Sequence, residues 1–170
     1  MAQPSHKKYF PTPVRLDLMI CYLWTCGRDD VPQGVFSHDT AFSLFPYSVW
    51  LPTEKHITVP RNFRRRGAPP EPTRLYKRDS DNLDVTMLEG VTVTKPVRTI
   101  VDLLASGFVQ RHHLRDFMRV ALETGFVTRV DMIGAHLDAQ ERKLFVDLLD
   151  TISYERIEDI RIGASIPASA

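Results

Sequence analysis

Three consecutive residues, Ser37, His38 and Asp39, are the residue types of a hydrolytic triad. In a working triad the base and the nucleophile meet across space, and an acid orients the base from behind. Successive residues at the start of a helix point in different directions and cannot take up that arrangement. We therefore expect Ser37 to be the N-cap of a helix, with Asp39 in its first turn, and no catalytic residue among the three.

Metal and nuclease chemistry have two further candidates, a histidine pair and a Glu-Arg-Lys triplet. His112 and His113 are adjacent, so on a helix their side chains diverge by about 100° and do not chelate one ion well. Glu141, Arg142 and Lys143 match half of a metal-dependent nuclease signature, but that signature needs a strand and the triplet lies in a helical pattern. We expect neither a metal site nor a cofactor, and a nuclease-type enzyme domain is the alternative to a binding protein.

Basic residues concentrate in residues 60–78, which hold seven lysines and arginines against the single acid Glu71, a net charge of +6. Guanidinium groups can each contact a phosphate or a carboxylate through two hydrogen bonds. We therefore predict that this segment binds nucleic acid or an acidic protein surface, the alternative being a solvated loop on a purely structural domain. Phe63, among the arginines, could stack on a base or pack onto the core. The predicted contact residues are Arg61, Arg64, Arg65, Arg66, Arg74, Lys77 and Arg78.

The composition is that of a globular domain with an uneven distribution of charge. The 170 residues are 43% hydrophobic and carry a net charge of +1, although residues 131–159 hold eight acids against three basic residues. No stretch approaches the roughly 20 apolar residues that span a bilayer, and residues 1–10 lack the apolar core of a signal peptide. We expect a cytoplasmic protein without a membrane partner, in which Cys21 and Cys26 are reduced thiols packed in the core.

The spacing of apolar residues predicts helices before and after a group of short strands. Helical spacing covers residues 14–26, 38–44, 96–107, 110–124, 128–137 and 139–153, and Thr128 with Asp131 resembles a capping box. Strands are predicted at residues 55–59 and 73–77, and residues 85–88 and 91–94 form a hairpin around Glu89 and Gly90.

This grouping favours an α+β fold, with a small, mostly antiparallel sheet that contains a hairpin and is flanked by N-terminal and C-terminal helices. We expect a flexible tail over residues 1–12 and one α+β domain over residues 13–137. A helical extension over residues 138–162 and a disordered tail over residues 163–170 would follow.

Two segments resemble a known family. Residues 34–44 (GVFSHDTAFSL) are followed by residues 56–60 (HITVP), and residues 90–104 read GVTVTKPVRTIVDLL. Their order and separation resemble the C-terminal domain of AbiEi-like proteins, the antitoxins and transcriptional regulators of type IV toxin–antitoxin pairs. The resemblance covers residues 13–137, although Phe45, Pro46 and Tyr47 stand where the family has His-Gly-Leu. The motif residues read as structural, and Arg98 can pair with Asp102 one helical turn later; they are Ser37, His38, Pro96, Arg98, Thr99 and Asp102.

The resemblance implies a non-enzymatic bacterial regulator that takes part in phage defence. In the family, a winged helix-turn-helix binds operator DNA; that half is missing here, and Tyr9 and Phe10 stand about where its last strand would end. DNA would then be reached through a separate helix-turn-helix. The resemblance also implies a nucleotidyltransferase toxin as the functional partner, and because the antitoxins of this family are described as counteracting the toxin without a stable complex, a direct complex is not implied.

Overall fold

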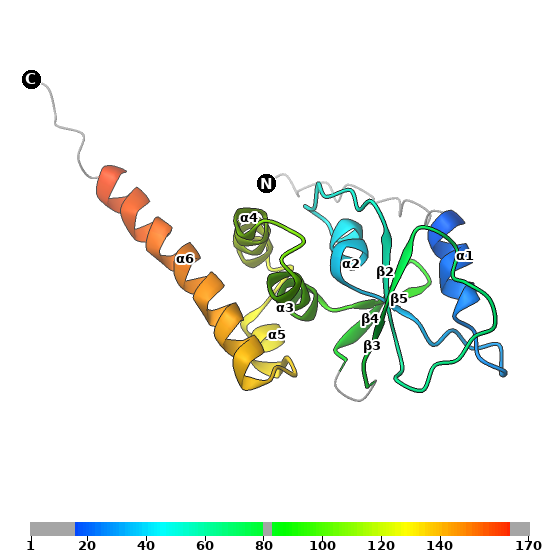
Figure 1. Ribbon diagram of the computed structural model, residues 1–170. Coiled ribbons are helices and arrows are strands. Elements are labelled where there is room, and N and C mark those ends of the chain that lie inside the picture. Colours follow the sequence, from blue (N-terminus) through cyan, green and yellow to red (C-terminus); the bar gives the residue numbers. More distant parts are fainter. Residues whose placement is uncertain (1–15, 80–82, 164–170) are drawn as a thin grey trace, which may run out of the picture.

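A computed structural model describes residues 16–79 and 83–163, with side chains through residue 152. The tails expected over residues 1–12 and 163–170 lie outside these ranges, apart from Gly163. The described ranges contain six helices and one five-stranded sheet (Figure 1). The strands are β1 (Val35–Phe36), β2 (Lys55–Val59), β3 (Thr73–Lys77), β4 (Val85–Leu88) and β5 (Val91–Thr94). The helices are α1 (Leu16–Trp24), α2 (His38–Leu44), α3 (Pro96–Ser106), α4 (Arg111–Glu123), α5 (Arg129–Gly134) and α6 (Ala139–Gly163).

The α+β class is confirmed, but the sheet is mixed, so the expected mostly antiparallel arrangement is wrong. Its order is β3-β2-β1-β5-β4. The pairs β2–β3 and β1–β5 are parallel, whereas β1–β2 and β4–β5 are antiparallel. Residues 60–72 join β2 to β3 and provide roughly the dozen residues that a parallel connection needs. The central strand β1 was not predicted, because its two residues are too few to show an alternating pattern.

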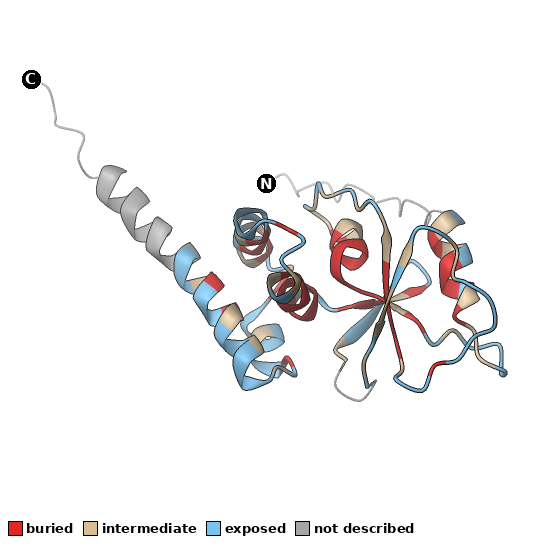
Figure 2. Cartoon of the chain, in the orientation of Figure 1, coloured by how far each residue is buried: buried red, intermediate tan, exposed pale blue. Residues whose placement is uncertain are grey.

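The helices lie in layers on the two sides of the sheet. Figure 1 shows α1 on one side and α2 and α3 on the other, with α4, α5 and α6 beyond α3. Helix α2 contacts β2 and β5, and α6 contacts α3 and α4. Buried residues lie in the sheet and in helices on both sides of it (Figure 2). They include Phe36, Ile57, Val93, Ile100, Leu114 and Leu148.

Local sequence signals account for several boundaries. Glu89 and Gly90 both have positive φ, 50° and 87°, as the tight turn of a two-residue hairpin requires. Gly107 ends α3 in the left-handed conformation. Thr128 and Asp131 form the capping box, in which the Thr128 side chain accepts from the Asp131 backbone N–H and the Asp131 carboxylate accepts from that of Thr128. These predictions are confirmed, whereas α5 stops at Gly134 rather than near residue 137.

Helix α6 continues to Gly163, beyond the expected end at residue 153. Phe145 and Leu148 of this helix are buried, so the C-terminal helix shares the core of the preceding elements. Despite its length of 25 residues, α6 is not apolar along its course. Among the described residues, none of the helices combines the length and the apolar composition that crossing a membrane requires.

Candidate functional site

The loop that joins β2 to β3 carries most of the predicted contact residues and is fastened to the body of the protein by Phe63. The Phe63 side chain is 7% exposed and packs against Trp24 of α1, with ring centroids 5.8 Å apart. Of the two roles considered for Phe63, the structure shows packing onto the core. The three arginines that follow Phe63 are exposed. The buried ring therefore holds the loop against α1 while its charged side chains face the solvent.

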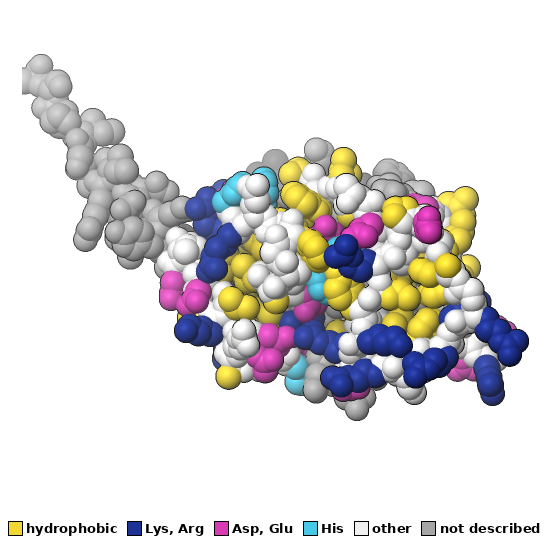
Figure 3. Space-filling view, viewed as in Figure 1, with side chains coloured by type: hydrophobic (Ala, Val, Ile, Leu, Met, Phe, Trp, Pro, Cys, Tyr) yellow, Lys and Arg dark blue, Asp and Glu magenta, His cyan; other side chains and the backbone are white. Residues whose placement is uncertain are grey.

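Arg64, Arg65 and Arg66 line an open groove together with Arg28, from the loop between α1 and β1. The groove has a volume of about 570 Å³, and none of its lining residues is an acid. Asp29 and Asp30 follow Arg28 in the sequence but do not line it. Figure 3 shows lysine and arginine side chains gathered along the lower right of the molecule, where Figure 1 places this loop. We call these four residues and their groove the arginine groove.

Two guanidinium groups of the arginine groove are held by main-chain carbonyls. Arg65 Nη1 donates to the carbonyl oxygen of Cys26 at 2.6 Å, and Arg64 Nη1 donates to that of Phe63 at 3.2 Å. These contacts orient the side chains without neutralising them, because a peptide carbonyl carries no net charge. Cys26, expected in the core, instead lines this groove as a half-buried free thiol, whereas Cys21 is buried as expected.

The other predicted contact residues are dispersed. Arg61 Nε lies 3.0 Å from Asp79, and Arg74 Nε lies 2.9 Å from Glu54, with its guanidinium over the ring of Phe108. Arg78 binds Asp102 at 3.1 Å and Glu141 at 2.8 Å. The side chain of Lys77 is exposed and makes no hydrogen bond or ion pair with the part of the chain that the structure describes. The predicted seven-residue surface is therefore reduced to three arginines, and Arg28, which lies outside the basic segment, joins them.

A buried ion network ties α3 and α6 to the end of β3. Arg98, only 2% exposed, donates through Nη1 and Nη2 to the two carboxylate oxygens of Glu141 at 2.9 and 2.8 Å. Arg98 also lies 2.8 Å from Asp102, which confirms the predicted pair one turn apart on the helix. Arg78 binds both acids, so two positive and two negative side chains balance.

Protonation of the network follows from burial and pairing. Burial raises the pKa of Asp102 and opposes the ionisation of Arg98 and Glu141. Hydrogen bonds and charges from Arg98 nevertheless hold the pKa of Glu141 at about 2, and the Glu141 carboxylate raises the pKa of Arg98. Glu141 thus lies on a helix with both oxygens bound to guanidinium groups. It lacks the strand position that the nuclease signature requires.

Ser37 was expected to cap α2 with its side chain, and this expectation is wrong. Ser37 occupies the N-cap position but its side chain makes no capping hydrogen bond. Instead its Oγ accepts from Thr58 Oγ1 at 2.8 Å and lies 3.0 Å from His38 Nδ1. The hydroxyl is drawn toward β2 and the imidazole, because both polar groups are buried beside it and need a partner.

His38 belongs to a packed aromatic cluster. Its ring stacks on Tyr76 of β3 at 4.0 Å with an interplanar angle of 12°, and it meets the edge of His56 at 5.8 Å. Burial, followed by the charges of His56 and nearby arginines, lowers the pKa of His38 to about 3, so the ring is neutral near pH 7. Among the described residues, no acid hydrogen-bonds to His38, so the Ser37–His38 contact lacks the third member of a triad.

The adjacent histidines of α4 lie closer than expected. The ring centroids of His112 and His113 are 4.0 Å apart, whereas helical geometry alone predicted divergence. The side chains can rotate toward each other because both are exposed. In residues 16–79 and 83–152, however, no three His, Cys, Asp or Glu side chains converge as a metal site would require.

The arginine groove is thus the one predicted feature whose residues the structure brings together with their charges open to solvent. The Ser37–His38 and Arg98–Asp102 motif residues contribute to packing and to buried polar contacts. The resemblance to AbiEi-like antitoxins rests on those two motifs and stays a prediction. No protein-family model and no curated protein matches this chain.

Proposed function

We propose that this protein is a regulatory domain of the antitoxin type that acts by binding, and that the arginine groove contacts the sugar–phosphate backbone of nucleic acid. The observation that carries the proposal is the groove itself, in which four arginines from two loops meet with no acid among the lining residues. Guanidinium groups bind phosphate oxygens with two parallel hydrogen bonds. Main-chain anchoring of Arg64 and Arg65 reduces the side-chain entropy lost on binding.

The geometry favours backbone contact over reading of bases. Phe63 is buried against Trp24 and is not available to stack on a base. A surface that contacts only phosphates gives affinity and orientation but little sequence preference. Sequence specificity would come from the helix-turn-helix that the family resemblance implies. The groove would then strengthen operator binding rather than select the operator.

Fluorescence anisotropy with a labelled duplex at low and moderate salt tests this role. We expect binding at low salt that weakens as salt rises, with a slope of about 0.9 in log K per phosphate contact. Replacing Arg64, Arg65 and Arg66 with alanine should abolish most of the binding and flatten the salt dependence. The matched control replaces three exposed arginines of α4, α5 and α6, namely Arg111, Arg129 and Arg142, which removes the same charge elsewhere.

Three results would count against nucleic-acid contact. The wild-type protein would fail to bind any duplex at low salt, or both triple variants would lose affinity equally, as net charge alone requires. Binding to polyglutamate but not to DNA would reassign the groove to an acidic protein partner. All variants need unchanged thermal unfolding for these comparisons to hold.

The antitoxin role is tested in cells. Co-expression with a nucleotidyltransferase toxin encoded beside the gene should restore growth, and the Arg64–Arg66 triple variant should restore it less well. Failure of the folded wild-type protein to restore growth would reject this role while leaving the nucleic-acid result unaffected.

A further inference from the structure

The two edge strands of the sheet differ in the side chains that they expose. Edge strand β3 carries the exposed Arg74 and Lys77, whereas β4, at the opposite edge, reads Val-Thr-Met-Leu and has no charged residue. Charged side chains on an edge strand oppose pairing with another chain. By this criterion β3 is protected against such pairing and β4 is not.

The main-chain groups of Val85 and Met87 point away from the sheet. The Lys95 N–H donates to the Asp84 carbonyl oxygen at 2.8 Å, so these two residues are a hydrogen-bonded pair of the β4–β5 hairpin. Such pairs alternate along an antiparallel ladder, so Thr86 bonds to β5 and its two neighbours do not. In the part of the chain that the structure describes, neither neighbour has a main-chain partner outside this hairpin. Their N–H and C=O groups are therefore open to a further strand.

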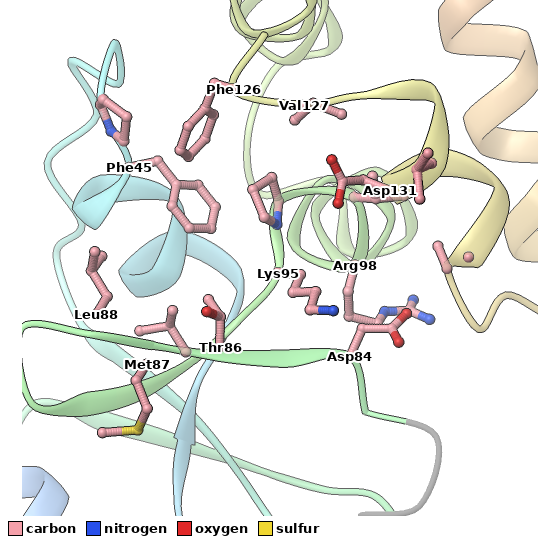
Figure 4. Close-up of a pocket in the computed structure, with 17 residues that line it drawn as sticks. Phe45, Asp84, Thr86, Met87, Leu88, Lys95, Arg98, Phe126, Val127 and Asp131 are labelled. Atoms are coloured by element: carbon pink, nitrogen blue, oxygen red, sulfur yellow. The ribbon is translucent and has the colours of Figure 1, made fainter.

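Apolar side chains surround this free edge. Val85 and Met87 are 38% and 63% exposed. Thr86 and Leu88 line a cavity of about 470 Å³, and Figure 4 shows both on the cavity side of the strand, with Met87 directed to the opposite side. Val130 of α5 lines the same cavity and is 78% exposed. Contiguous exposed apolar surface is typical of sites where proteins associate.

Strand β4 is complementary to a second copy of itself. Two antiparallel copies related by a two-fold axis at Thr86 place Val85 of each copy opposite Met87 of the other. Each of these two pairs exchanges both of its N–H···O=C bonds, so every outward main-chain group of the two residues gains a partner. At the axis Thr86 faces Thr86, and Asp84 faces Leu88. No like charges therefore lie opposite each other.

We propose that this protein forms a two-fold dimer in which β4 pairs with β4 of a second copy, so that two five-stranded sheets become one. A closed two-fold contact requires a surface that is complementary to itself, and the register at Thr86 provides it. Pairing through β3 would instead gather the exposed Arg74 and Lys77 of both copies. Because the axis is perpendicular to the sheet, the two cavities lie on the same face of the joined sheet. So short a pairing gives a weak dimer.

Sedimentation equilibrium of the whole protein, without nucleic acid, tests the dimer. We expect the mean mass to rise from that of a monomer toward twice that value as the concentration approaches about 1 mM, where even a millimolar Kd is detected. The backbone amide signals of Val85 and Met87 in NMR should shift over the same concentrations, because their N–H groups gain acceptors. Since nucleic acid is absent, this result does not depend on the proposed function.

Opposite charges at Thr86 test the register. The side chain is exposed, so lysine or glutamate should be tolerated there. Thr86→Lys and Thr86→Glu each place like charges opposite each other at the axis and should weaken association about fivefold. An equimolar mixture of the two variants should associate at least as tightly as the wild type, because lysine then faces glutamate. The controls Thr151→Lys and Thr151→Glu, at an exposed threonine of α6, should associate as the wild type does, alone or mixed.

Met87→Pro tests the main-chain contact. The Met87 N–H faces away from β5, so proline removes no hydrogen bond of the hairpin and should leave thermal unfolding nearly unchanged. The dimer, however, loses one hydrogen bond on each side of the axis and should weaken about tenfold.

A wild-type protein that stays monomeric at about 1 mM would overturn the proposal. Association that is unchanged in the Thr86 variants and in Met87→Pro would place the contact on another surface and overturn it as well. If both Thr86 variants associate weakly but do not recover when mixed, the two-fold register at Thr86 is wrong.

Discussion

The guanidinium of Arg98 pairs side by side with the carboxylate of Glu141, 43 residues later in the chain, at 2.8 and 2.9 Å. A helix–helix contact thus depends on a charge pair inside the protein. Such pairs contribute little net stability compared with apolar packing, but removing one partner leaves the other buried and unpaired. Replacing Arg98 or Glu141 alone should therefore cost more stability than replacing both together with apolar residues.

Glu141→Gln should destabilise the protein by up to about 3–5 kcal/mol, because Arg98 and Arg78 would then share Asp102 as the one remaining acid of the network. Urea unfolding measures the loss. Glu123→Gln is the control: this acid pairs with Arg119 on the exposed face of α4, and such a pair contributes about 0.3–0.5 kcal/mol. Equal losses for both variants would show that the buried network carries no special energetic weight.

Stability should fall as the pH drops below about 6.5, partly because of His38. The folded protein holds the pKa of His38 at about 3, below its ordinary 6.5. Between these pH values His38 is protonated in the unfolded chain but not in the folded protein. The contribution of His38 to the free energy of unfolding is therefore fully present above pH 6.5 and decreases as the pH falls toward 3. His38→Phe keeps a ring beside Tyr76 and should flatten the pH dependence of the urea midpoint between pH 7 and 5.

NMR of the histidine side chains provides the direct check on that titration. The His38 ring should stay neutral at pH 5, whereas a ring with an ordinary pKa is mostly protonated there. Titration of His38 near pH 6.5 would contradict the buried stack with Tyr76.

Below about pH 4.5 a second loss should follow from Glu141. Its folded-state pKa of about 2 lies below the ordinary 4.5, so the stabilising contribution is present above pH 4.5 and is lost as the pH falls through 2. Glu141→Gln should remove this acid-dependent component, which urea unfolding at pH 5 and pH 3 would reveal. The same slope in both proteins would mean that other carboxylates dominate acid unfolding.

Phe63→Ala should both destabilise the protein and weaken nucleic-acid binding. The buried ring fastens the loop to Trp24, and its removal costs about 3–5 kcal/mol through lost packing and a cavity. Phe63→Leu preserves much of the apolar volume and should lose less in both assays. If Phe63→Ala remains folded and binds DNA as the wild type does, the arginine groove does not depend on that anchor.

Gly90 and Gly134 provide a matched pair for backbone strain. An added Cβ meets open space at both positions, but only Gly90 has a positive φ, +87°. Gly90→Ala should therefore cost about 1–2 kcal/mol, while Gly134→Ala should be neutral or stabilise α5 by up to about 1 kcal/mol. Thermal unfolding of the two variants compares them, and similar shifts would contradict the hairpin turn conformation.

Several local signals in the sequence predicted the structure correctly. Glu89 and Gly90 indicated the hairpin, Thr128 and Asp131 the start of α5, and the spacing of Arg98 and Asp102 their ion pair, because each signal involves neighbours within one turn of chain. Strand β1 gave no such signal, since its two residues obtain their partners from β2 and β5 far along the chain.

Partners from distant segments also explain the limits of the predicted contact surface. A run of arginines shows where positive charge lies but not which acids will meet it. Arg78 forms ion pairs with Asp102 and Glu141, and Arg74 forms one with Glu54. Arg28, by contrast, joins the arginine groove from another loop. Ser37 was assigned to a cap because its sequence neighbours favour one, but Thr58 from the adjacent strand engages its hydroxyl.

The parallel pairing of β2 and β3 limits how the basic loop can vary. The connection has to return along the whole length of β2 before β3 begins, so residues 60–72 form a tether whose span is fixed by the sheet. One-for-one exchange of Arg64, Arg65 or Arg66 alters the charge and the side-chain contacts but keeps the length of the loop. Deleting the three would remove the charge and would also shorten the tether to ten residues, which still have to pass Trp24, where Phe63 packs, before they reach β3. Charge and length at this place in the chain are therefore separable by substitution but not by truncation.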